Sequence, residues 1–201
     1  MHAENKDEMR DKILEAALRR FTHYGAAKTT MNEIADDLHC SKASLYYYFP
    51  DKKAMHLAVL EKIAEAYFTE MAKVTENIQS AAQALYDLID VKKVFISKFC
   101  RLEIFKIQHD GASSFQEGVK RAKLIEIGVC TEIIKAGIAS GEFNVADAAQ
   151  TSELMVQALV GLRFSVPDHF TNDADLDEKT FEHVIEKQKM LIDIFIKAMK
   201  A

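Results

Sequence analysis

Hydrogen-bond donors are concentrated between residues 41 and 53 of this 201-residue chain. Hydroxyl and ammonium groups donate to phosphate oxygens, and the start of a helix also favours an anion. The three consecutive tyrosines at 46–48 cannot all face inward from a helix, because neighbouring side chains are about 100° apart. At least one of the three tyrosines is therefore exposed to solvent, where its hydroxyl, with the other hydroxyl and ammonium groups of this stretch, can donate to an anion such as a phosphate.

Catalytic and metal-binding patterns do not stand out in the sequence. It has no HExxH, no Gly-rich phosphate loop and no GxSxG motif. Its three cysteines lie far apart without a CxxC pair, which predicts neither a zinc site nor a disulfide framework. His183 and Glu186 have the reverse order of the Glu-x-x-His motif of di-iron bundles. We expect no enzyme, no metal and no cofactor. A helical-bundle enzyme is the weaker alternative, and stoichiometric metal in the purified protein would reveal it.

The donor-rich stretch lies within two short predicted helices joined by a tight turn. An amphipathic helix precedes them and ends at Gly25. Thr30 and Glu33 have the spacing of a capping box, which starts the first short helix. Ser41 is a suitable N-cap for the second. The arrangement, at about residues 31–50, is a helix-turn-helix, whose second helix fits a DNA major groove about 12 Å wide.

The rest of the chain is also predicted to be helical, so the fold class is all-α. Only 7 Gly and 2 Pro are available for turns, too few for a multi-stranded sheet. Asp51 is a suitable N-cap for a fourth helix that runs to about residue 73. The last two helices are dense in apolar side chains, so we expect them to form the four-helix interface of a homodimer. The later helices are predicted at 81–107, 115–139, 147–166 and 176–199.

The net charge of −5 is unevenly distributed along the chain. Residues 1–53 hold nine basic and nine acidic side chains, so the acidic excess belongs to the remainder. No stretch approaches about 18 uncharged apolar residues, and the amino terminus is charged rather than apolar. We therefore expect a cytoplasmic protein without a membrane partner.

The helix-turn-helix resembles the DNA-binding signature of the TetR family. Two positions depart from that signature, because His39 and Ala43 stand where glycine is common. His39 must tolerate the backbone of the turn, including a left-handed conformation, which histidine adopts at modest cost. The matching positions are Thr29-Thr30, Ile34-Ala35, Ser41-Lys42, Leu45-Tyr46, Tyr48-Phe49 and Lys52.

The resemblance implies a role in DNA binding for individual residues. Lys42, Ala43 and Ser44 would face base edges, and Tyr46 and Tyr47 would contact phosphates or bases. The start of the fourth helix and one of the two threonines would hold the DNA backbone, whereas Leu45 and Phe49 are expected to be packed inside. The complete set of DNA-contacting candidates is Thr29, Thr30, Ser41, Lys42, Ala43, Ser44, Tyr46, Tyr47 and Lys52.

The resemblance further implies two domains, a DNA-binding domain over residues 8–68 and an effector-binding and dimerisation domain over residues 69–201. The second would enclose a cavity for an apolar or amphipathic small molecule. The candidate cavity residues are Phe95, Phe99, Leu102, Phe105, Ile127, Cys130, Ile134, Met155, Leu159 and Phe164.

The expected function is that of a ligand-responsive repressor bound to double-stranded operator DNA. The alternative is a helical ligand-binding or interaction module that has lost DNA binding, which the neutral amino-terminal part favours.

Overall fold

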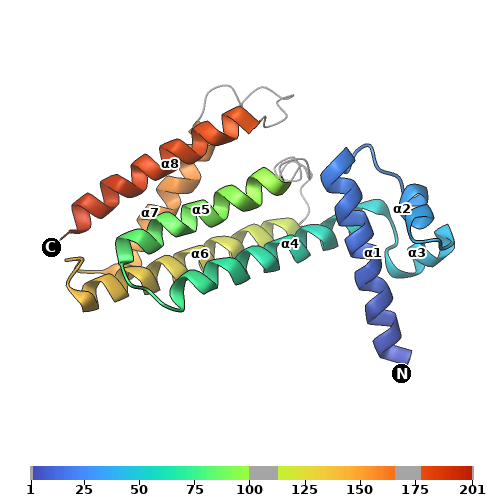
Figure 1. The fold of residues 1–201 in the computed structure, drawn as a ribbon, viewed down its shortest axis with the longest axis horizontal. Helices are drawn as coiled ribbons and strands as arrows, with labels where there is room; N and C mark the ends of the chain where they lie inside the picture. Colours follow the sequence, from blue (N-terminus) through green and yellow to red (C-terminus); the bar gives the residue numbers. More distant parts are fainter. Residues whose placement is uncertain (1, 100–112, 166–177, 201) are drawn as a thin grey trace. The chain divides into compact units, whose positions relative to one another are not determined.

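Helices form the fold in the computed structural model, which describes residues 2–99, 113–165 and 178–200 (Figure 1). The expected all-α class is confirmed. None of the helices in these ranges combines the length and apolar character needed to cross a membrane. The helices are α1 (His2–Tyr24), α2 (Met31–Asp37), α3 (Lys42–Tyr48), α4 (Lys52–Thr75), α5 (Ala81–Phe99), α6 (Ser113–Ser140), α7 (Ala148–Ser165) and α8 (Glu178–Met199).

The chain divides into two compact units. Unit 1 comprises Met1–Glu65 and Lys98–Gln116, and unit 2 comprises Ala66–Ser97 and Glu117–Ala201. The first boundary falls inside α4, so this one helix contributes its beginning to unit 1 and its end to unit 2.

Unit 1 is built around apolar residues that recur along one face of α1. Ile13, Ala17 and Phe21 are fully buried there, as the spacing in the sequence predicts. The helix ends as expected at Gly25, whose φ of 85° lies in the left-handed region that glycine adopts without a steric penalty. Asp51 caps α4 by accepting a hydrogen bond from the backbone N–H of Ala54 at 2.7 Å, which confirms its predicted role.

Unit 2 is a bundle in which α7 lies beside α8 (Figure 1). Its core includes Leu85, Ile133 and Met155, which are almost completely buried. The Glu142 carboxylate, just after α6, accepts hydrogen bonds from the backbone N–H groups of Ala81 and Ala82 at the start of α5. Burial alone would raise the pKa of Glu142, but these bonds outweigh it and lower that pKa below its usual value.

Candidate nucleic-acid interface and ligand cavity

The turn between α2 and α3 is fixed by local hydrogen bonds. Thr30 Oγ1 accepts from the backbone N–H of Glu33, whose carboxylate accepts from the Thr30 N–H at 2.8 Å, so the predicted capping box is present. Ser41 Oγ accepts from the backbone N–H of Ser44 at 3.2 Å, as expected of an N-cap. His39, between the two helices, has φ of 51°, which confirms the predicted left-handed turn.

The α3 helix has a buried side and an exposed side. Leu45 is 0% exposed and Phe49, just after the helix, is 3% exposed, so both are packed as expected. Tyr46 is 42% exposed and Tyr47 is 69% exposed. Donor-bearing side chains therefore lie on the solvent side of a short helix that is held from behind by apolar contacts.

Lys42 and Ala43, in the first turn of α3, are exposed as well, and Ser44 is half-buried. The Lys42 ammonium lies 5.7 Å from the centre of the Tyr46 ring, within the range of a cation–π contact. A cation and a phenol hydroxyl thus project from neighbouring turns of α3. Both groups donate hydrogen bonds, and neither is enclosed by the protein.

The two adjacent threonines differ from one another. Thr29 is 1% exposed, and its hydroxyl donates to the backbone carbonyl of Gly25 at 3.0 Å. Its side chain closes the loop between α1 and α2, which corrects the expectation that it contacts a phosphate. Thr30 is exposed, but its hydroxyl already donates to the Glu33 carboxylate at 2.8 Å.

Lys52, the first residue of α4, is engaged with the protein itself. Its Nζ donates to the carbonyl oxygens of Ala26 at 3.0 Å, Ala27 at 3.2 Å and Thr29 at 3.0 Å. An ammonium group has three N–H donors, so these carbonyls account for all of them. Lys52 therefore holds the α1–α2 loop against the start of α4, a contact that the sequence did not suggest.

Two carboxylates near the helix-turn-helix share one arginine. Arg20 forms a bidentate pair with Asp37, at 2.6 and 2.8 Å, and lies 3.4 Å from Glu33. The Arg20 hydrogen bond lowers the pKa of Asp37, and hydrogen bonds from Thr30 lower that of Glu33. Both groups therefore stay ionised at neutral pH, and Arg20 offsets one of their two negative charges.

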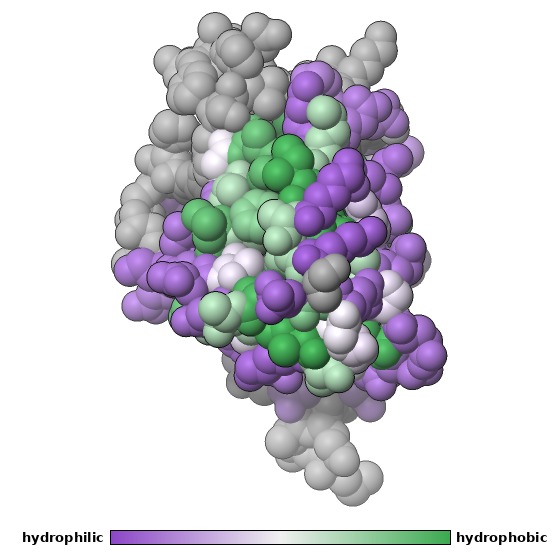
Figure 2. Space-filling model, turned by 90° about the vertical axis from the view of Figure 1, so that its left-hand side faces the viewer, coloured by the Kyte–Doolittle hydropathy of each residue, from purple (hydrophilic) through white to green (hydrophobic). Residues whose placement is uncertain are grey.

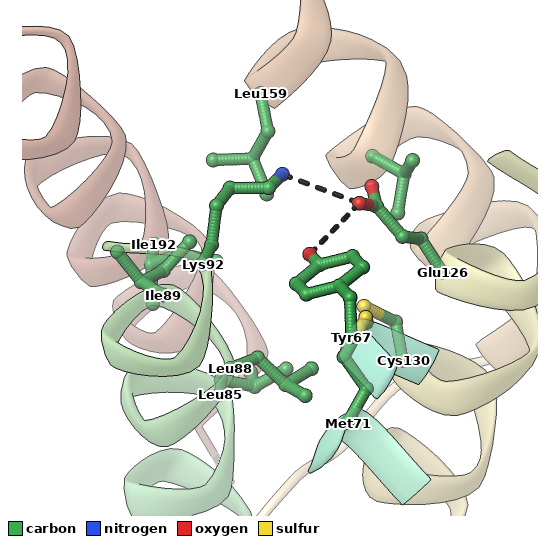
Figure 3. A pocket seen from close by; sticks show the side chains of 11 residues that line it. Tyr67, Met71, Leu85, Leu88, Ile89, Lys92, Glu126, Cys130, Leu159 and Ile192 are labelled. Carbon is green, nitrogen blue, oxygen red and sulfur yellow. Dashed lines mark hydrogen bonds and ion pairs between the residues drawn. The ribbon is translucent and has the colours of Figure 1, made fainter. Parts of the chain in front are cut away.

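Unit 2 contains a small cavity lined by residues of α4, α5, α6, α7 and α8 (Figure 3). The Tyr67 hydroxyl of α4 donates to Glu126 Oε1 of α6 at 3.0 Å. Lys92 Nζ of α5 lies 3.5 Å from the same oxygen. The rest of the lining is apolar and consists of Met71, Leu85, Leu88, Ile89, Cys130, Val156, Leu159 and Ile192.

The polar groups of the cavity are largely shielded from water. The side chains of Lys92 and Glu126 are 16% and 15% exposed. Burial, reinforced by Glu126, raises the pKa of Tyr67 well above its usual value, so its hydroxyl remains a neutral donor. The same two causes raise the pKa of Cys130 to about 12, so its thiol stays protonated. The free volume is about 20 Å³, enough for one water molecule.

The predicted cavity residues are only partly found at this cavity. Cys130 and Leu159 line it. Ile134 and Met155 are instead 0% exposed within the close-packed core, because they face helix contacts rather than free space. Phe99 is 7% exposed and belongs to unit 1, which corrects its assignment to this cavity.

Two more candidates, Phe95 and Ile127, are partly buried, and Phe95 lines a shallow surface groove beside Val91 and Val94. Leu102 and Phe105 lie outside the described residues, as does the side chain of Phe164.

The polar residues of the cavity were not among the predicted cavity residues, although their spacing along α5 and α6 indicates that they face the core. Lys92 occurs four residues after Leu88 and three after Ile89, within the apolar stripe of α5. Glu126 precedes the buried Cys130 by four residues, on the same face of α6. A charged residue at an apolar position of a helix needs a partner inside the protein, and here the two charges are partners.

Exposed apolar side chains are present on α7 and α8. Leu154, Met190 and Ile194 are between 59% and 61% exposed. The face of the molecule drawn in Figure 2 also carries hydrophobic side chains gathered in a strip, with hydrophilic side chains around it. Gathered apolar surface is typical of an interface.

Comparisons with known proteins agree with the geometry of unit 1. The family model of bacterial regulatory proteins of the tetR family matches residues 13–59, which include α2 and α3. The transcriptional repressor NicS of Pseudomonas putida is 27% identical over 163 residues, which cover 79% of this chain and 77% of NicS.

Two solved structures extend the likeness to the whole fold. A transcriptional regulator from Cytophaga hutchinsonii is 31% identical with a TM-score of 0.85, over 94% of this chain and 97% of that one. A putative transcriptional regulator from Saccharomonospora viridis, solved in complex with choline, is 21% identical with a TM-score of 0.67, over 93% and 96%. Since the likeness spans the helix-turn-helix and the helical remainder alike, the chain belongs to the TetR family of bacterial regulatory proteins and is a DNA-binding transcriptional regulator.

Proposed function

We propose that this regulator represses transcription by placing α3 in the major groove of an operator, and that a small molecule bound in unit 2 releases it. The main observation in support of DNA binding is that α3 has one buried side and one exposed side. Leu45 and Phe49 fix the helix from behind, while Lys42, Tyr46 and Tyr47 face solvent. A helix held in this way can present its donors to base edges and phosphates.

The charge around α3 supports this assignment despite the neutral amino-terminal sequence. The helix itself carries Lys42 and no acidic residue. Arg20 pairs with Glu33 and Asp37 of α2 and offsets one of their two negative charges. The α3 helix itself is therefore more favourable to phosphates than the count of nine basic and nine acidic residues suggests.

Within the proposed interface, Lys42, Ala43 and Ser44 read base edges, and Tyr46 and Tyr47 contact phosphates or bases. Ser41 and Thr30 are exposed and remain candidate contacts besides capping α3 and α2. Lys52 acts from behind the interface by holding the loop, rather than by contacting DNA.

Dimerisation through α7 and α8 places two copies of α3 about 34 Å apart, or a multiple of one turn, as successive major grooves require. The exposed Leu154, Met190 and Ile194 supply apolar surface for that contact. A ligand relieves repression only if it binds better to an arrangement with a different spacing. The naming of NicS as a repressor supports the direction of the response, and the choline complex supports a ligand site in this fold.

Binding to a duplex from the region beside the protein's own gene tests the proposal. We expect saturable binding that weakens steeply with salt, and loss of that binding in a Lys42→Ala, Tyr47→Ala double variant. Tyr24→Ala is the matched control, because Tyr24 is a 56% exposed tyrosine of α1, outside the proposed interface. If no genomic fragment binds at low salt, the chain is instead a ligand-binding or interaction module.

A further inference from the structure

The cavity of unit 2 holds one positive and one negative charge in an otherwise apolar lining. Lys92 and Glu126 come from α5 and α6, and both side chains are less than one fifth exposed. Tyr67 adds a neutral hydroxyl that donates to Glu126 (Figure 3). The polar end of the cavity is therefore electrically balanced as it stands.

We propose that this cavity binds an amphipathic molecule without net charge, whose polar end accepts a hydrogen bond from Lys92 and donates one to Glu126. The inference rests on the proposed ligand response and names the chemical class of the effector. Amides, lactams and similar groups carry an adjacent acceptor and donor and belong to this class.

Charge balance is the first reason for this choice. A carboxylate ligand would leave two negative charges facing one lysine, and an ammonium ligand would leave two positive charges facing one glutamate. An uncompensated charge in a shielded, apolar site is strongly unfavourable. A neutral head group adds hydrogen bonds without disturbing the balance.

The distance between the two charged groups is the second reason. Lys92 Nζ and Glu126 Oε1 are 3.5 Å apart, longer than the usual 2.7–3.2 Å of an N–H···O bond. An acceptor placed beside Lys92 and a donor placed beside Glu126 would each form a shorter bond than the present contact. A polar group that carries both an acceptor and a donor can therefore bridge Lys92 and Glu126.

The apolar part of the ligand would occupy space that is now closed. The free volume of about 20 Å³ is far below the roughly 150 Å³ that accommodates a benzene-sized molecule. Binding must therefore displace side chains such as Met71, which is unbranched and adaptable, or move the helices that carry Leu88 and Leu159. A ligand that has to open its own cavity necessarily favours a different arrangement of unit 2.

Calorimetric titration of the full-length protein, without DNA, tests the inference with three probes of one alkyl chain length. Hexanamide is neutral, hexanoate is an anion and hexylammonium is a cation. We expect hexanamide to bind at least about tenfold more tightly than either ion. Tighter binding of an ion overturns the proposal, and so does the absence of binding by all three at their solubility limits.

Two variants make the expectation sharper because they unbalance the cavity in opposite directions. Lys92→Met should shift the preference by at least about tenfold towards hexylammonium, and Glu126→Gln should shift it likewise towards hexanoate. Glu132→Gln is the matched control, since it breaks an exposed ion pair with Lys135 on α6 and should leave the order unchanged. Identical preferences in the wild type and both cavity variants would refute the assignment.

The test separates this inference from the proposed function. If the protein binds its operator but shows no preference for the neutral probe, the regulatory proposal stands and the proposed ligand class is refuted. If the protein prefers the neutral probe but binds no DNA, the proposed ligand class stands and the proposed repression is refuted.

Discussion

Replacement of Lys52 by methionine distinguishes a structural clamp from a DNA contact at the start of α4. The variant keeps an unbranched stem but loses the ammonium that bonds to the carbonyls of Ala26, Ala27 and Thr29. Ala26 and Thr29 are buried, so their carbonyls regain water poorly when the donor is removed. A hydrogen bond to a charged group contributes about 1.5–3 kcal/mol, and Lys52 is itself only partly buried. We therefore expect a total loss of about 2 kcal/mol.

For a chain of this length each kcal/mol corresponds to about 2–4 °C, so the Tm should fall by about 4–8 °C. Lys28→Met is the matched control, because Lys28 is exposed in the same loop and carries the same charge. Both measurements use thermal unfolding followed by circular dichroism.

Operator binding over a range of salt concentrations supplies the second readout. A lysine that contacts a phosphate contributes about 0.9 to the slope of log affinity against log salt. Because the donors of Lys52 are occupied by the loop, Lys52→Met should leave that slope unchanged. An unchanged Tm together with a slope reduced by about 0.9 would refute the clamp and make Lys52 a DNA contact.

Three further predictions concern packing, ionisation and assembly. Gly137→Ala should lower the Tm, because a Cβ there would lie 2.3 Å from the buried Phe143 ring. Gly128→Ala, on the same helix, meets nothing within 4 Å and should stabilise the folded protein by about 0.5–1 kcal/mol. Equal effects of the two substitutions on the Tm would contradict the close contact at Gly137. The pKa of Asp37 is lowered in the folded protein, so its ionised form stabilises the fold above the usual pKa of 3.8, and this stabilisation is lost as the pH falls further. The Tm difference between the wild type and Asp37→Asn should therefore narrow from about pH 6 to about pH 3. A constant difference would contradict a stabilising role of the ionised carboxylate. Ile194→Glu on α8 should convert the proposed dimer to a monomer in sedimentation experiments. Leu124→Glu on α6 is the control, because Leu124 is a similarly exposed apolar residue outside α7 and α8, and this variant should remain a dimer. Dimers of both variants would show that the interface lies elsewhere.

Local hydrogen bonding explains why the helix-turn-helix could be predicted residue by residue. The Thr30–Glu33 box and the Ser41 cap each join positions three residues apart, so the sequence contains both partners. The left-handed turn at His39 followed from the family resemblance, and the burial of Leu45 followed from helical spacing.

Contacts between distant parts of the chain could not be obtained in the same way. Arg20 and Asp37 are separated by 17 positions, and Lys52 bonds to carbonyls 23 to 26 positions away. The predicted cavity residues carry no charge, because the family resemblance implies a cavity for an apolar or amphipathic molecule. The structure has the charged pair Lys92–Glu126 there, since only tertiary packing brings α5 and α6 together.

Continuity of α4 relates the two halves of the proposed mechanism. Its first residue, Lys52, is bonded to the loop that leads into α2, and Tyr67 of the same helix is bonded to Glu126 in the cavity. A neutral ligand that donates to Glu126 Oε1 would compete with the Tyr67 hydroxyl at that oxygen. Release of Tyr67 would free the end of α4 from α6, while the Lys52 contacts keep its beginning tied to the helix-turn-helix. In the proposed mechanism, displacement of α4 would move α2 and α3 together, so a small change at the cavity would alter the position of the recognition helix rather than its fold.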